Sequence, residues 1–176
     1  PVVRAMLEKA PSTNAVLRTT TALTVVQAGN KDNVLPGFAD ATVNYRLLPG
    51  DTRDAVFKHV QDVVPHSDRF AITTLPGSAE ASPVSPTASA SYQLLNRTVR
   101  SLFPDVVVAP GLMIGGTDSR HFAAISDHIY RFSPVRASAD DLKRFHGTNE
   151  RISTANLAEL VGFYVQLLRN AQALPA

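Results

Sequence analysis

The chain has 176 residues, of which 44% are hydrophobic, and a formal net charge of +2, which suits one ordinary domain or two small ones around a normal soluble core. It contains no cysteine, so disulfides and thiolate chemistry are excluded and only His, Asp and Glu remain as metal ligands, while the compartment stays open. Because basic residues form no run and no apolar stretch reaches the roughly 18 residues of a spanning helix, we expect a soluble protein without a nucleic-acid partner or a membrane span.

The first 76 residues predict alternating helices and strands. The expected order is helix, strand, strand, helix and strand, over residues 1–10, 18–27, 38–48, 51–64 and 69–74. Pro11–Asn14 is expected to end the first helix, and the stretch 38–48 alternates apolar and polar residues as a half-buried strand does. This order is most of a split β-α-β sandwich, an α+β fold, whose first strand would lie upstream of residue 1.

The second half predicts a different organisation. Residues 77–90 are rich in Pro, Ser and Ala without periodicity, which indicates a crossing between domains. The elements expected after it are a helix, a strand, a helical turn, a strand and a long helix, over residues 90–103, 106–109, 119–124, 129–132 and 154–172. This alternation is typical of an α/β layer. The last helix is expected to begin at an N-capping Ser153 and to bury the stripe Leu157, Leu160, Val161, Tyr164, Leu167 and Leu168.

A single histidine, His146, stands on the polar loop that precedes the last helix. Phe145 on one side and Gly147 on the other give it a hydrophobic wall and an open approach, which suits a metal ligand. A surface histidine near the start of a helix fits the same pattern. His121 and His128 are weaker candidates, because they neighbour apolar predicted strands, where a structural histidine is commoner.

One further stretch, residues 115–120, combines residues that can recognise anions. Gly115, Gly116 and Thr117 precede a predicted helical turn, so their backbone N–H groups could hold a carboxylate, and Arg120 could clamp it. A turn with a surface arginine is the alternative. No Walker, dinucleotide or nucleophile-elbow motif is present.

Asn33 precedes the second predicted strand, and Arg46 lies within it. Asn33 lies in the turn before it, and Arg46 lies on its polar face between apolar neighbours. On the pattern alone, a turn asparagine and an edge-strand arginine without further role are the favoured interpretation.

Taken together, five motifs resemble a known family. They are residues 18–24 (RTTTALT), 33–36 (NVLP), 44–51 (NYRLLPGD), 115–120 (GGTDSR) and 145–150 (FHGTNE). In this order they resemble the C-terminal half of a co-catalytic zinc exopeptidase or aminoacylase, closest to the carboxypeptidase S and N-fatty-acyl-amino-acid hydrolase branch. The resemblance implies a lid and dimerisation domain over residues 1–76, a crossing over 77–90 and the C-terminal part of an α/β catalytic domain over 91–176.

The resemblance also implies roles for individual residues. His146 matches a metal ligand, Arg120 with Gly115, Gly116 and Thr117 matches the substrate-carboxylate side of the site, and Asn33 and Arg46 match lid residues that close over the substrate. The other zinc ligands and the general base would lie upstream, so no catalytic residue is assigned here.

For the parent protein the resemblance implies two zinc ions, a homodimer formed through the lid, and hydrolysis of an amide bond in an N-acyl amino acid or at a peptide C-terminus. The chain alone, with one ligand, is expected to hold no zinc stably and to be inactive. The competing hypothesis is a non-catalytic dimerisation or ligand-binding module.

Overall fold

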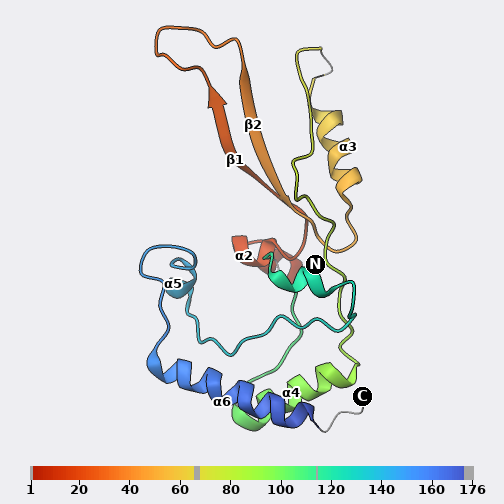
Figure 1. Ribbon diagram of the computed structural model, residues 1–176, viewed down its shortest axis with the longest axis vertical. Helices are drawn as coiled ribbons and strands as arrows, with labels where there is room; N and C mark the ends of the chain where they lie inside the picture. The colour runs from red at the N-terminus through yellow and green to blue at the C-terminus, as the bar shows by residue number, and fades with distance from the viewer. Residues whose placement is uncertain (1, 66–67, 114, 173–176) are drawn as a thin grey trace. The chain divides into compact units, whose positions relative to one another are not determined.

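The computed structural model describes residues 2–65, 68–113 and 115–172 (Figure 1). Within these residues the chain divides into two compact units. The first unit contains residues up to Val84 together with residues 115–116, and the second unit contains residues 85–113 and those from Thr117 onward. The structure mixes helices with a two-stranded antiparallel sheet. Each unit is built by its own local contacts.

The first unit begins with two short helices, α1 (Val2–Leu7) and α2 (Pro11–Asn14). The predicted helix over 1–10 is confirmed for Val2–Leu7, and Pro1 lies outside the described residues. The first helix ends at Leu7, before the predicted break at Pro11–Asn14, and Pro11 in addition starts a new helical turn. Proline fits at that position, where the missing N–H would have no helical partner.

A β-hairpin forms the centre of the first unit. Strand β1 (Thr20–Ala28) pairs antiparallel with β2 (Ala39–Arg46), from Thr20 opposite Arg46 to Ala28 opposite Ala39, with one irregularity between Leu23 and Val25. Both strands match their predictions. The half-buried face expected for β2 is absent, since only Thr42 and Tyr45 are partly covered. No helix among the described residues makes an extensive contact with the hairpin, so neither face is buried.

Helix α3 (Arg53–Val63) follows the hairpin, as predicted. The Thr52 hydroxyl accepts a hydrogen bond from the Ala55 N–H at 3.1 Å and caps the helix. The strand expected over 69–74 does not form, although this segment runs alongside α3 in Figure 1. Residues with strand propensity need a hydrogen-bonded neighbour to become a strand, and no ladder reaches this segment.

The second unit is organised by helices α4 (Ala90–Leu102) and α6 (Thr154–Ala171), which pack against each other. The buried hydrophobic side chains among the described residues are Leu94, Val99 and Phe163. Thr98 is fully buried between the helices, where its hydroxyl donates to the Leu94 carbonyl at 2.9 Å and accepts from the Asn170 amide at 2.8 Å. A polar contact therefore accompanies the apolar core.

The buried face of α6 differs from the predicted stripe. Leu157 and Val161 remain 51% and 58% exposed, whereas Phe163 is 1% and Asn156 is 3% exposed. Asn156, Phe163 and Asn170 are spaced by seven residues and therefore share one helix face. Because that face begins and ends with asparagine, a hydrophobicity pattern assigns the buried side to the neighbouring leucines instead.

The connections of the second unit contain no strand among the described residues. The strands predicted over 106–109 and 129–132 are irregular, and the predicted turn over 119–124 is the 3-10 helix η1 (Asp118–Phe122). Residue 129 instead bonds a side chain: the Ser85 hydroxyl accepts from the Ile129 N–H at 2.9 Å and donates to the Ile129 carbonyl at 3.0 Å. A side chain replaces the missing strand partner.

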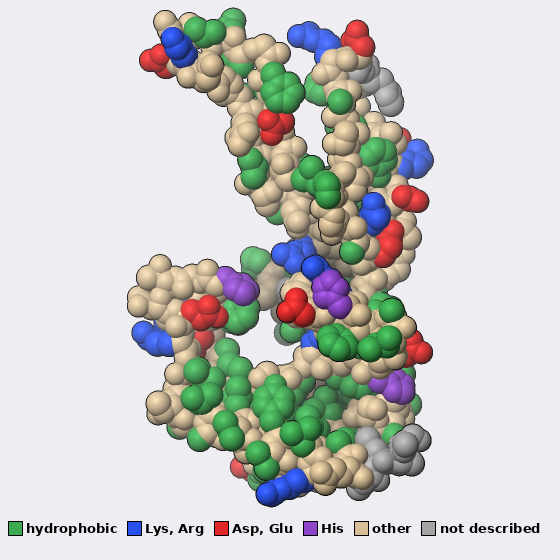
Figure 2. All heavy atoms as spheres, in the orientation of Figure 1, with side chains coloured by type: hydrophobic (Ala, Val, Ile, Leu, Met, Phe, Trp, Pro, Cys, Tyr) green, Lys and Arg blue, Asp and Glu red, His purple; other side chains and the backbone are tan. Residues whose placement is uncertain are grey.

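The surface of the second unit is rich in apolar side chains. Figure 2 shows them gathered on the visible face above α6, and Leu157, Val161 and Leu168 of α6 contribute to the exposed set. None of the described helices combines the length and the apolar character needed to cross a membrane.

Candidate functional site

The loop of residues 137–152, named here the His146 loop, lies in the second unit and leads into α6. It contains the short helix α5 (Ala139–Leu142), which is closed by a capping box. The Asp141 N–H donates to the Ser138 hydroxyl at 3.3 Å, and the Ser138 N–H donates to the Asp141 carboxylate at 2.9 Å. The Ser138 hydroxyl also donates to the Asp141 carboxylate at 2.6 Å, and this bond, with those from the Ser138 N–H and from Arg144, lowers the pKa of Asp141 to about 2.

His146 occupies an unusual backbone conformation within this loop. Its φ angle is 59°, in the left-handed region that residues other than glycine rarely adopt. Its N–H donates to the Glu150 carboxylate at 3.1 Å, and its ring lies 4.5 Å from the Phe145 ring, centroid to centroid, at 63°. The phenyl wall expected from the sequence is therefore present beside the imidazole.

The residue after His146 is held just as closely. The Gly147 N–H donates to the Arg144 carbonyl at 2.8 Å. A Cβ on Gly147 would lie 3.3 Å from that same oxygen, so a larger residue would push the backbone apart. Glycine here allows the chain to turn tightly immediately after the imidazole.

The imidazole of His146 can serve as one metal donor. The residue is exposed, and neither ring nitrogen is hydrogen-bonded to another residue in the described part of the chain. Residues 2–65, 68–113 and 115–172 contain no group of three or more His, Cys, Asp or Glu side chains that could hold a metal. His146 thus fits a metal site only if further ligands come from outside these residues.

The other two candidate histidines behave differently. The Nε2 atom of His121 accepts a hydrogen bond from the Arg120 Nε at 3.2 Å, which occupies that ring nitrogen. His121 and His128 are both exposed and do not pack in a core. Both histidines therefore lie at the surface, whereas the sequence predicted structural histidines beside apolar strands.

Gly116 of the glycine-rich stretch lies next to the Arg46 side chain in the first unit. A Cβ placed on Gly116 would lie 3.8 Å from Nη1 of Arg46, so the guanidinium rests against the open backbone of this glycine. Arg46 is the last residue of β2 and its partner in β1 is Thr20. Two motifs that are 70 residues apart in the sequence, by subtraction of 46 from 116, come together here.

The structure separates Asn33 from Arg46. Asn33 lies in the connection between the strands, beyond the Ala28–Ala39 pair, whereas Arg46 is at the opposite end of the hairpin. The length of β2 alone corresponds to about 24 Å at the usual rise of a strand. The two residues are both exposed, and they do not form one local cluster.

Residues 117–120 form a turn with its own hydrogen bonds. The Arg120 N–H donates to the Thr117 carbonyl at 3.2 Å, and the hydroxyls of Thr117 and Ser119 bond each other. Thr117 precedes η1 without capping it through its side chain, and Arg120 is exposed. The turn leaves the Arg120 Nη atoms at the surface.

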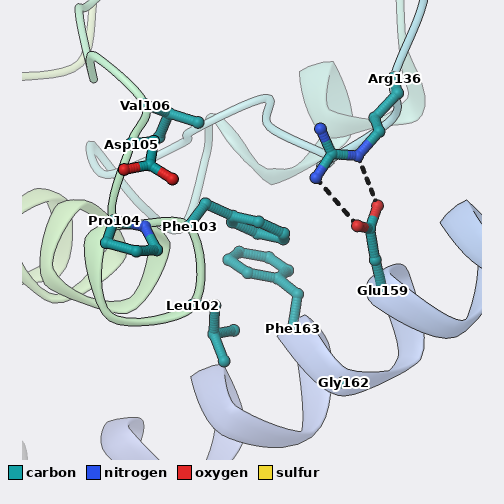
Figure 3. A pocket seen from close by; sticks show the side chains of 9 residues that line it. All are labelled: Leu102, Phe103, Pro104, Asp105, Val106, Arg136, Glu159, Gly162 and Phe163. Atoms are coloured by element: carbon teal, nitrogen blue, oxygen red, sulfur yellow. Dashed lines mark hydrogen bonds and ion pairs between the residues drawn. The ribbon is translucent and has the colours of Figure 1, made fainter.

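A polar cluster that the sequence patterns did not reveal lies at the start of α6. The Glu159 carboxylate accepts from Arg136 Nε at 2.7 Å and Arg136 Nη2 at 2.9 Å, a bidentate pair (Figure 3). These hydrogen bonds raise the pKa of Arg136 and, with a further bond from Asn156, lower the pKa of the Glu159 carboxyl. The arginine Cζ also lies 5.7 Å from the centre of the Phe103 ring.

An open cavity of about 420 Å³ lies beside this cluster. The residues that line it are Leu102, Phe103, Pro104, Asp105, Val106, Arg136, Glu159, Gly162 and Phe163 (Figure 3). Its walls come from the end of α4, the segment after it, Arg136 and α6. The sequence signal that would have found it is the helical spacing from Glu159 to Phe163, which places a charged residue next to the buried phenylalanine.

Comparison with known proteins gives matches along nearly the whole chain. Residues 3–71 match the peptidase dimerisation domain. The chain is 46% identical over 172 residues to the N-fatty-acyl-amino acid synthase/hydrolase of Xenopus tropicalis, a match that covers 97% of the chain and 33% of that relative. The human protein of the same name is 42% identical over 174 residues, with 97% and 34% covered.

A second group of relatives carries a different name. The "Probable carboxypeptidase S-like 2" of Dictyostelium discoideum is 43% identical over 172 residues, which are 98% of this chain and 33% of the relative. No solved structure matches the chain. The chain spans about a third of the length of these relatives. Along nearly its whole length the chain is similar to carboxypeptidase S-like proteins and N-fatty-acyl-amino acid synthase/hydrolases, and residues 3–71 match the peptidase dimerisation domain.

Proposed function

We propose that these 176 residues are part of a zinc-dependent hydrolase that cleaves an amide bond next to a free carboxylate. The substrate is an N-acyl amino acid or the C-terminal peptide bond of a peptide. The observation that carries the proposal is the identity of 42–46% along 97% of the chain to N-fatty-acyl-amino acid synthase/hydrolases. The names of these relatives and of the carboxypeptidase S-like protein point to two substrate classes, N-acyl amino acids and peptides. In both, the bond that is cleaved is an amide next to a free carboxylate.

In this proposal His146 donates one ring nitrogen to a two-zinc site that residues outside this chain complete. Its exposure, its fixed ring and the absence of a competing hydrogen bond in the described chain support that role. When bound, the zinc ions polarise the scissile carbonyl and lower the pKa of a water molecule. A general base outside these residues moves the proton.

The remaining candidates would bind the substrate. Arg120, with the backbone of Gly115, Gly116 and Thr117, holds the free carboxylate, because a guanidinium and free N–H groups are the donors that a carboxylate prefers. Asn33 and Arg46 belong to the lid and reach the substrate when it closes. The approach of Arg46 to Gly116 supports a shared role, since it adds a second cation to the glycine-rich stretch.

The proposed domain arrangement follows the family. Residues 1–76 form a split β-α-β lid that also mediates a homodimer, residues 77–90 cross between domains, and residues 91–176 complete the catalytic domain. The match of residues 3–71 to a dimerisation domain supports the first assignment. The chain by itself is inactive, because one histidine cannot replace the roughly three protein ligands that a catalytic zinc requires.

The test is hydrolysis by the full-length, zinc-loaded protein. N-acyl amino acids and peptides with a free C-terminus are compared with matched amides in which the carboxylate is replaced by a carboxamide. Hydrolysis of the acids and loss of most kcat/KM with the carboxamides is the expected result. Equal rates for both series, or no hydrolysis of either by zinc-loaded protein, would overturn the proposal.

A non-catalytic dimerisation module is the second candidate. It is favoured by one observation, the match of residues 3–71 to a dimerisation domain rather than to a catalytic one. In this case the full-length protein associates through the hairpin without hydrolysing any member of either series. The same assay therefore separates the two candidates.

A further inference from the structure

We propose that Asn156 and Glu150 are positioning residues that hold the His146 loop in its binding geometry before any metal arrives. The inference rests on the proposed function, in which His146 is a zinc donor. It concerns two residues that do not touch the metal: Asn156 ties the base of the loop to α6, and Glu150 fixes the backbone at the imidazole itself.

The base of the loop is joined at the Asn156 side chain. Its Oδ1 accepts from the Arg136 N–H at 2.9 Å, and its Nδ2 donates to the Pro134 carbonyl at 2.9 Å. The Asn156 N–H, in turn, donates to the Ser153 hydroxyl at 3.1 Å. Asn156 therefore bonds the segment before the loop and the residue directly after it, which brings the two ends of the loop to one point.

The chemistry of this position requires an amide. Besides the Pro134 carbonyl, Nδ2 donates to the Glu159 carboxylate at 3.0 Å, so both of its hydrogens and the amide oxygen are used. The residue is 3% exposed, so these groups have little access to water. Aspartate would place an acceptor oxygen where Nδ2 now donates to the Pro134 carbonyl and the Glu159 carboxylate. Alanine would leave these buried partners without a hydrogen bond.

The tip of the loop is fixed by Glu150. The left-handed conformation of His146 is costly for a residue with a side chain and persists only when its surroundings enforce it. The hydrogen bond from the His146 N–H to the Glu150 carboxylate and that from the Gly147 N–H to the Arg144 carbonyl provide this enforcement. They set the direction in which the imidazole leaves the backbone.

A fixed imidazole makes metal binding stronger because the loop does not have to be ordered at that moment. Supporting residues of this kind typically contribute about 10- to 100-fold in metal affinity. We therefore expect the zinc affinity of the full-length protein to fall in this range for Asn156→Ala and by roughly the lower value for Glu150→Ala.

The first experiment measures the loop without metal. Amide hydrogen exchange of His146 and Gly147 is followed in the full-length, zinc-free protein. Glu150→Ala should speed exchange at both amides, whereas Glu150→Gln should restore most of the protection, because its side-chain carbonyl can still accept the His146 N–H. Lys143→Ala is the control, since Lys143 pairs only with the exposed Asp140 in the described structure. Equal exchange in all variants would overturn the role of Glu150.

The second experiment measures zinc affinity by competition with a chelator. Asn156→Ala should weaken binding while a global unfolding measurement still shows a folded protein; an Asn156→Ala protein that is folded and binds zinc normally would overturn the role of Asn156. If Asn156→Ala does not fold, exchange of the Arg136 amide in Asn156→Ser, which retains a smaller hydrogen-bonding group, provides the test. Protection equal to that of the parent protein would contradict the role.

His146→Ala separates this inference from the proposed function. Loss of zinc in His146→Ala with unchanged zinc in both positioning variants would overturn only the inference. Full retention of zinc in His146→Ala would overturn the ligand role itself. In that case, faster amide exchange at His146 in Glu150→Ala would still show that Glu150 holds the backbone of the His146 loop, while unchanged exchange would overturn that role as well.

Discussion

At the residue scale, the backbone of the His146 loop is the feature that sets its chemistry apart. His146 and Asn149 are the residues other than glycine that have a positive φ in the described chain, at 59° and 62°. Asparagine tolerates this conformation well, and histidine is one of the few other residues found there repeatedly. Both lie within four residues, so the loop turns sharply on each side of Gly147.

Asn149 offers a direct test of this strain. We expect Asn149→Ala to lower the free energy of unfolding by about 1 kcal/mol, because a left-handed conformation is costly for an ordinary side chain. Asn149→Gly should cost less, since glycine adopts positive φ readily. Urea unfolding of the two variants beside the parent protein measures the difference. An alanine variant as stable as the glycine variant would argue against the left-handed turn.

Arg120 provides a test of substrate recognition. If its guanidinium binds the substrate carboxylate, Arg120→Ala in the full-length protein should raise KM about 10- to 100-fold, because hydrogen bonds to charged groups contribute roughly 1.5–3 kcal/mol. Zinc content should remain that of the parent protein. Steady-state kinetics with a metal assay measures both, and the carboxamide substrate is the control. Unchanged KM for the acid would remove Arg120 from the binding site.

Single residues also show how far the sequence could predict the site. The contact of the His146 ring with Phe145 could be predicted from the sequence, because the two residues are adjacent in the chain. The roles of Asn156 and Glu159 were not predicted. Their partners Pro134 and Arg136 lie about 20 residues away in the sequence, and a local sequence pattern contains no information on such distant hydrogen bonds. The contact of Arg46 with Gly116 depends on the fold in the same way.

At the element scale, helices were predicted far better than strands. Helices α3, α4 and α6 appear where they were predicted, and each begins at a residue whose side chain caps it, Thr52, Ser89 and Ser153. A helix satisfies its hydrogen bonds within itself, so its sequence contains most of the needed information. The segments 69–74, 106–109 and 129–132 failed as strands because a strand depends on a partner elsewhere in the chain.

The packing of α6 on α4 centres on Phe163. We expect Phe163→Ala to destabilise the protein by about 3–5 kcal/mol, the usual cost of removing a buried phenylalanine. Leu157→Ala, on the exposed side of the same helix, should change stability by less than about 1 kcal/mol. Thermal or urea unfolding measures both. Similar losses for the two variants would show that the hydrophobic stripe predicted from the sequence faces a partner after all.

The capping box of α5 predicts a dependence on acid. The pKa of Asp141 is lowered from its ordinary value of 3.8 to about 2, so the ionised carboxylate stabilises the fold above about pH 4. This contribution is lost as the pH falls from about 4 to about 2, where the folded state also becomes protonated. Hydrogen exchange in residues 138–144 should accelerate over that window. Asp141→Asn should remove this acid step, and a step of unchanged size in the variant would assign it to another group.

At the scale of the whole molecule, no described residue pairs with the outer edge of either hairpin strand, and both faces of the hairpin are exposed. Exposed strand edges favour pairing with another chain. If residues 3–71 act as the dimerisation domain that they match, the full-length protein should be a dimer by light scattering across the micromolar range. A charged substitution at an exposed apolar position of β1, such as Val26→Lys, should shift it toward monomer. A monomer at every concentration would contradict association through the hairpin.

Asn156 and Asn170, near the two ends of α6, bond this helix to two different partners: Asn156 to Pro134 and Arg136, and Asn170 to Thr98 of α4. A slide of α6 by one turn, about 5.4 Å, would detach Asn170 from the Thr98 hydroxyl and Asn156 from Pro134 and Arg136 together. A purely apolar interface would tolerate such slippage much better, because leucines and valines can exchange neighbours. The two asparagines therefore fix the position of α6 along its own axis. Because the His146 loop leads into α6, the bond from Asn170 to Thr98 at the far end of the helix also helps to set the position of the imidazole.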